Sequence, residues 1–158
     1  GTVVVDGEEF PEIEYRQRDA TLTGAEGTAE TNLTPRVVAG VMGDVMRGRF
    51  SGGAPLPFMP ASRLGGTVRW ENAGLSAGVE VRHAFRQSAT PESELRTDAY
   101  TLAHLQLGWS FIGRSAVNSI TFRVDNLFDT EYREATSRIK HVAANPGRNF
   151  SLVYRVLF

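Results

Sequence analysis

The chain contains no cysteine, which excludes disulfide bonds, thiolate metal sites and a cysteine nucleophile. It also lacks a basic excess, because 17 Lys and Arg stand against 18 Asp and Glu for a formal net charge of -1, and nucleic acid is therefore not expected as a partner. No hydrophobic run approaches the roughly 18 to 20 residues of a transmembrane helix. A membrane β-barrel needs no such run, since its strands alternate lipid-facing apolar residues with polar residues.

What the sequence does contain is a period of two between apolar and polar residues, the pattern of β-strands. In one stretch Ile120, Phe122 and Val124 alternate with Thr121 and Arg123. The same pattern covers seven segments, weakest in the first: 20–33, 36–45, 63–71, 75–87, 99–111, 119–132 and 148–158. We therefore expect an all-β protein with about seven antiparallel strands and no helix.

The predicted connections alternate between short and long. Short ones follow residues 33, 71 and 112, and long ones cover 48–61, 87–97 and 133–146. Outer-membrane barrels have short periplasmic turns and long extracellular loops. The spacing thus predicts an up-and-down transmembrane barrel segment whose last strand runs toward the periplasm, with residues 1–18 as an extracellular loop.

A soluble β-sandwich would show the same alternation, since its strands also have one buried and one solvated face. Aromatic residues favour the barrel, because they gather near both ends of the strands, as interfacial girdles do. At the short-turn ends these are Trp70, Trp109, Phe111 and Phe158, and at the long-loop ends Phe85, Phe128 and Tyr132. Charged residues share the other parity, as expected for a wet lumen wall: Arg36, Arg69, Arg82, Arg123, Arg155, Asp44, Glu71, Glu80, Asp125 and Asp129.

Candidate catalytic and metal sites have weak support. His83, His104 and His141 fall on different segments without metal-ligand spacing. Asp125 and Asp129, if both lie on one strand face, would be about 13 Å apart, too far for paired acid and base catalysis. Without a nucleophile triad or a phosphate-binding loop, we predict a non-enzyme with no cofactor.

One loop carries a cluster of cations, Arg138, Lys140 and His141. Positive charge in an extracellular loop favours an anionic ligand such as a ferric siderophore, although a merely solvated loop explains the same residues.

Several motifs resemble those of TonB-dependent outer-membrane receptors. The stretch Val124 to Tyr132, which contains Asp125, Asn126, Leu127, Phe128 and Asp129, is similar to their penultimate-strand signature. Pro146 to Phe150, leading to a terminal Phe, resembles their last strand. Asp19-Ala20 with Gly24 to Glu26, and Pro57 to Gly65, are further matches, so the resemblance covers nearly the whole chain.

The resemblance implies a barrel of about 22 strands around an N-terminal plug, and a receptor that imports a scarce small-molecule nutrient. The energy-coupling protein TonB would contact this receptor through the plug region. Residues 1–158 would then be the C-terminal portion of a single outer-membrane barrel domain in contact with lipid, without the plug. The resemblance also implies that alternate residues of the last strand form the signature read by the barrel assembly machinery: Phe150, Leu152, Tyr154, Val156 and Phe158.

Two alternatives remain, a passive small barrel or porin and a soluble β-sandwich that binds a ligand. Bacterial single-chain barrels have an even number of strands, so about seven strands predict an open sheet that belongs to a larger barrel. A closed eight-stranded barrel that uses residues 3–18 would instead favour the small barrel.

Overall fold

A computed structural model describes residues 2–5, 7–11, 17–113 and 115–158. In these ranges the secondary structure consists of strands, turns and loops, without a helix, and therefore no helix has the length and hydropathy of a membrane span. The strands are β1 (Thr2–Val5), β2 (Glu8–Pro11), β3 (Ala20–Thr34), β4 (Val37–Phe50), β5 (Arg63–Asn72), β6 (Leu75–Ala84), β7 (Tyr100–Ile112), β8 (Val117–Asp125) and β9 (Asn149–Leu157).

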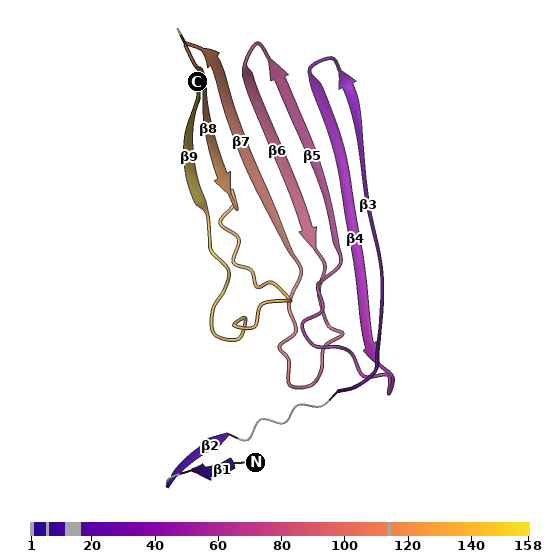
Figure 1. Ribbon diagram of the computed structural model, residues 1–158. Coiled ribbons are helices and arrows are strands. Elements are labelled where there is room, and N and C mark those ends of the chain that lie inside the picture. Colours follow the sequence, from indigo (N-terminus) through magenta and orange to yellow (C-terminus); the bar gives the residue numbers. More distant parts are fainter. Residues whose placement is uncertain (1, 6, 12–16, 114) are drawn as a thin grey trace.

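Seven of these strands form one antiparallel sheet in the order β3-β4-β5-β6-β7-β8-β9, so every strand pairs with its neighbours in sequence (Figure 1). Within the described residues β3 pairs with β4 alone and β9 with β8 alone. The sheet is therefore open, with two free edges within the described residues, and the prediction of an open antiparallel sheet of about seven strands is confirmed. The closed eight-stranded alternative is wrong, because β1 and β2 pair with each other and not with the sheet.

Connections at the two ends of the sheet differ as the sequence predicts. At one end the strands are joined by short connections, which follow residues 34, 72 and 112, and at the other end by the longer segments 51–62, 85–99 and 126–148 (Figure 1). The two-residue turn between β5 and β6 has positive φ at both of its residues, 48° at Ala73 and 84° at Gly74. This is the type I′ geometry that matches the twist of a two-residue hairpin.

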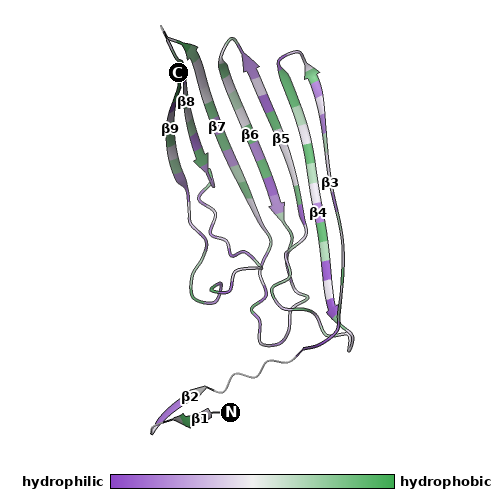
Figure 2. Ribbon diagram, viewed as in Figure 1, coloured by the Kyte–Doolittle hydropathy of each residue, from purple (hydrophilic) through white to green (hydrophobic). Residues whose placement is uncertain are grey.

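The register places apolar and charged residues on opposite faces of the sheet. Val68 of β5 pairs with Val79 of β6, which pairs with Leu105 of β7, while Arg69 and Glu80 have the opposite parity. The alternation is visible as green and purple bands along the strands in Figure 2. We name the side with Val68, Val79 and Leu105 the apolar face and the other the charged face.

Two sequence predictions about the end of β8 are wrong. The strand predicted for 119–132 ends at Asp125, because Asn126 has a φ of 50° and turns the chain out of the sheet. Asp129 therefore does not lie four residues along the same strand face as Asp125. Tyr132, expected in an outer girdle, packs instead against Tyr100 of the charged face, with ring centroids 4.7 Å apart.

The N-terminal stretch expected as a loop contains a hairpin of β1 and β2, with Gly7 in its turn at a φ of 86°. The part of that prediction that covers 12–16 lies outside the described residues.

The most deeply buried cluster lies at the long-loop end of the charged face. Ala84, Tyr100 and Leu102 are 0%, 8% and 1% exposed, and Ala61 and Tyr132 from the long loops pack on them. The long loops thus cover this end of the charged face, and they form the framework of the site described next.

Candidate functional site

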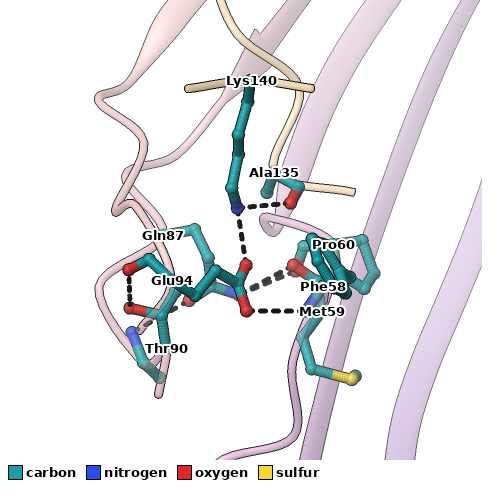
Figure 3. Close-up of polar contacts among 9 residues, drawn as sticks. Phe58, Met59, Pro60, Gln87, Thr90, Glu94, Ala135 and Lys140 are labelled. Carbon is teal, nitrogen blue, oxygen red and sulfur yellow. Dashed lines mark hydrogen bonds and ion pairs between the residues drawn. The ribbon is translucent and has the colours of Figure 1, made fainter. Parts of the chain in front are cut away.

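The three long loops are joined by one buried ion pair. Lys140 of the β8–β9 loop lies 2.5 Å from the Oε1 atom of Glu94 in the β6–β7 loop, and the two side chains are 3% and 5% exposed (Figure 3). Glu94 also accepts a hydrogen bond at Oε2 from the backbone N–H of Phe58 in the β4–β5 loop, at 2.8 Å. Lys140 donates a second bond to the Ala135 carbonyl at 2.7 Å. A single carboxylate therefore connects all three loops.

Further contacts fix the same loops. The Gln87 side-chain amide donates to the Met59 and Pro60 carbonyls at 3.3 and 3.0 Å (Figure 3). The Phe58 ring lies 5.7 Å from the Arg138 guanidinium carbon and 5.6 Å from the Lys140 ammonium. These distances allow cation–π attraction, which is stronger for the desolvated Lys140 than for the exposed Arg138.

The loop cations named from the sequence divide into two kinds. Arg138 and His141 are exposed, whereas Lys140 is buried in the ion pair. Sequence reasoning missed Glu94 as its partner, since the two residues lie 46 positions apart. Of these three side chains, Arg138 and His141 are therefore open to solvent.

Beneath the loops lies a polar cluster against the sheet. Glu134 of the β8–β9 loop lies 3.9 Å from the Arg82 guanidinium of β6, and its backbone N–H donates to Asn145 at 2.9 Å. Burial and the nearby Glu134 carboxylate raise the pKa of Tyr132 above its ordinary value, so this phenol stays neutral at physiological pH.

Ion pairs also line the charged face below the loops. Arg63 contacts Asp44 at 2.9 Å, and Arg69 contacts Glu30 at 3.2 Å, so both pairs join neighbouring parts of the wall. The Asp125 carboxylate accepts from Arg123 at 2.7 Å and lies 2.8 Å from His104 Nδ1. A shallow cavity of about 160 Å³ opens on this wall, and it is lined by Thr67, Arg69, Gly78, Val79, Glu80, His104, Leu105, Gln106 and Arg123.

The motif at Asp125 to Tyr132 forms a closed turn at the end of β8. The buried Asn126 side chain donates to the Thr130 carbonyl and accepts from the Thr130 N–H, both at 2.9 Å. Leu127 N–H donates to the Ala103 carbonyl at 2.8 Å. Asp129 accepts from the Arg148 N–H at 2.7 Å, just before β9. The motif thus fixes where β8 ends and where β9 begins, while Phe128 remains exposed.

Alternate residues of β9 lie on the apolar face. Phe150, Leu152, Tyr154 and Val156 pair with β8 residues of that face, and the first three are 61%, 71% and 60% exposed. Tyr154 donates its hydroxyl to Asn118 at 2.6 Å, and Phe158 follows the strand with a fully exposed side chain. The structure thus brings these residues into one row along β9, from Phe150 beside the long loop to Phe158 at the short-turn end.

In the described part of the chain, no three His, Asp or Glu side chains form a group that could hold a metal ion. His83 and His104 lie on opposite faces of neighbouring strands, and His141 lies in a loop.

Comparison with known proteins finds similarity both in sequence and in structure. The chain is 30% identical over 125 residues to a protein named rhizobactin receptor from Rhizobium meliloti (strain 1021), a match that covers 76% of the chain and 16% of that protein. The chain thus spans about a sixth of its relative. A solved structure named copper transporter OprC superposes with a TM-score of 0.72 at 22% identity, over 84% of this chain and 23% of that one. No family model matches.

Proposed function

Since this chain belongs to the TonB-dependent outer-membrane receptor family and forms part of the receptor β-barrel, we propose that it provides wall and loops for the import of a small-molecule nutrient. In this proposal the chain supplies seven strands of a barrel of about 22, and the apolar face contacts lipid. TonB acts through a plug region outside residues 1–158.

The cargo we propose is an anionic iron chelate of the ferric siderophore class. The observation that carries this choice is the relationship to a protein named for rhizobactin, which extends over 125 residues. Arg138, which is exposed at the long-loop end, gives the site a positive charge that suits such a ligand, and His141 is exposed in the same loop. The likeness to the copper transporter is at 22% identity and supports the fold alone.

A binding titration tests the cargo. The receptor that contains this chain would be titrated with ferric rhizobactin and, as a second probe, with cobalamin. We expect the ferric chelate to bind, and the double variant Arg138→Gln/His141→Gln to weaken that binding about tenfold, by roughly 1.4 kcal/mol. Lys140 is left unchanged because it is a buried partner of Glu94.

The control variant is Arg36→Gln in the short β3–β4 turn, at the other end of the sheet. If the wild type and the loop variant bind the ferric chelate equally, Arg138 and His141 are not part of the binding site. Uptake of the ferric chelate that is unchanged in cells without TonB would favour a passive pore over the proposed importer.

A further inference from the structure

Charge on the apolar face is confined to one end. The acidic residues of the seven-stranded sheet all have the opposite parity: Glu26, Glu30, Asp44, Glu71, Glu80 and Asp125. The apolar face carries cationic residues, Arg47 and Arg49 of β4 and the titratable His83 of β6, and all three lie at the long-loop ends of their strands. In Figure 2 this end of β4 is purple beyond its green and white bands.

The register fixes the direction of the two arginines. Arg47 pairs with Thr23 and Arg49 with Thr21, without a bulge between these pairs. Gly48, which lies between them, has the opposite parity, and the side chains of Leu56 and Met59 cover it. Both arginines therefore extend from the apolar face, and both are exposed.

A third arginine approaches the same place from the β6–β7 loop. A cavity of about 230 Å³ is lined by Arg47, Arg49 and Arg86, and the hydroxyl residues Ser62 and Ser88 also line it. Arg49 donates to the Gly53 carbonyl at 3.3 Å, a neutral acceptor that does not balance its charge. Among the residues that the structure describes, no carboxylate lies within 4.0 Å of Arg47 or Arg49.

Arg86 is partly balanced, since its Nε atom lies 3.6 Å from the Asp98 carboxylate. The cavity therefore offers more positive than negative charge, together with hydroxyl donors. Guanidinium groups bind phosphate through paired N–H donors, which makes a phosphate group the fitting occupant.

The depth of the cluster identifies the source of that phosphate. Val41 and Val45 precede Arg47 on the same face, and at the rise of a β-strand Arg47 lies about 7 Å beyond Val45. The guanidinium groups are thus at the boundary of the apolar band, at the level of lipid headgroups. The opposite boundary of this face carries Trp70 and Trp109, without charged side chains in the strands there.

We propose that Arg47, Arg49 and Arg86 bind the phosphate groups of a phosphorylated glycolipid in the outer leaflet. This site rests on the proposed contact of the apolar face with lipid and is independent of the imported nutrient. The site would hold the barrel at a fixed depth in the membrane. In β4, Val41 and Val45 contact the lipid chains, and Arg47 and Arg49, which follow them, bind the phosphate groups.

The test compares lipids that differ in phosphate alone. The purified receptor in detergent would be titrated with bis-phosphorylated lipid A and with the same lipid after removal of both phosphates. We expect the wild type to bind the phosphorylated form at least tenfold more tightly. The variant Arg47→Gln/Arg49→Gln should lose that preference, whereas Arg36→Gln/Arg155→Gln, which removes the same charge at the short-turn end, should keep it.

A second variant avoids truncating the arginines. Thr23→Glu places a carboxylate opposite Arg47 and should reduce the preference in the same direction, by about tenfold. Equal binding of the two lipids by the wild type, or a full preference in both variants, would overturn the proposal. Displacement of lipid A by millimolar inorganic phosphate alone would also overturn it, since the site would then bind phosphate without a lipid.

Discussion

The ion pair between Glu94 and Lys140 should control the opening of the long loops, and the substitution Lys140→Met tests this. The change removes the ammonium and leaves the Glu94 carboxylate, 5% exposed, without its charged partner. Burial of an unpaired charge is costly, because little water remains to solvate it. The Phe58 N–H still donates to that carboxylate, but one hydrogen bond does not replace the lost ion pair.

Removal of one partner from a buried ion pair costs about 3 to 5 kcal/mol. If loop opening restores the hydration of Glu94, this cost appears as a lower free energy of local opening. At 1.4 kcal/mol for each factor of ten, backbone amides in 51–62 and 126–148 should exchange with solvent about 100 to 4,000 times faster. Amides of the central strands should keep their rates, since the sheet itself is unchanged.

The assay is hydrogen exchange followed by mass spectrometry on the receptor that contains this chain. Arg138→Met is the matched control, because it removes an exposed cation near the same Phe58 ring, and it should cost at most about 1 kcal/mol. The double variant Glu94→Gln/Lys140→Met leaves no buried charge and keeps an acceptor for the Phe58 N–H, so it should recover most of the protection. Equal exchange rates in the wild type and Lys140→Met would refute the role of the pair.

Three further predictions concern the sheet and its ends. Leu107→Arg, on the apolar face near the middle of β7, should destabilise the barrel in lipid by about 2 to 4 kcal/mol, while the neighbouring Gln106→Arg on the charged face should be mild; unfolding in urea with lipid vesicles measures both. Asn126→Ala removes both hydrogen bonds to Thr130 and should cost about 1 to 3 kcal/mol, read from the same unfolding curves, and an unchanged midpoint would argue against the turn as a fixed point. Deletion of Phe158 from the receptor should lower its amount in the outer membrane, measured by heat-modifiable gel migration, far more than it changes stability.

The strands were predictable because their pattern is long and repeated. On the apolar face of β6 and β7 the apolar residues pair with each other, as in the pairs Ala77 with Leu107 and Val79 with Leu105, so period two alone gives both the strand and its face. Even β3, the weakest pattern in the sequence, forms a strand of 15 residues. β3 pairs with β4 along its whole length through backbone hydrogen bonds. Backbone pairing does not depend on hydrophobic side chains, so the hydrophobicity of β3 does not indicate it.

The end of β8 was not predictable from alternation. Phe128 and Tyr132 continue the apolar parity of Val124, so the pattern extends past the strand. What ends the strand is the positive φ of Asn126, together with the reciprocal bonds between Asn126 and Thr130. Asn tolerates this backbone region better than most residues, so its position was the available signal.

Alternation also fails to predict that the long-loop end of the charged face is buried. Alternation predicts that residues of this parity meet water, yet Leu102 and Ala84 are among the most buried residues of the chain. Leu102 already departs from the polar pattern of β7, and Tyr100 precedes it on the same face. Two apolar residues in succession on a face that is otherwise polar indicate that something covers them, and Tyr132 and Ala61 of the loops do so.

The packing of the β8–β9 loop on the charged face also fixes the position of the cations in that loop. Glu134, close to Tyr132 in the same loop, reaches Arg82 of β6, so the β8–β9 loop is held against the charged face by a ring contact and by an ion pair. Lys140 is held in turn by Glu94, which leaves Arg138 and His141 on the exposed side of the same loop. A loop fixed in this way presents its exposed cations without the entropy cost of ordering them when a ligand binds. The buried pair and the exposed cations therefore have separate roles, and substitutions at Lys140 should change loop opening while those at Arg138 and His141 change ligand affinity.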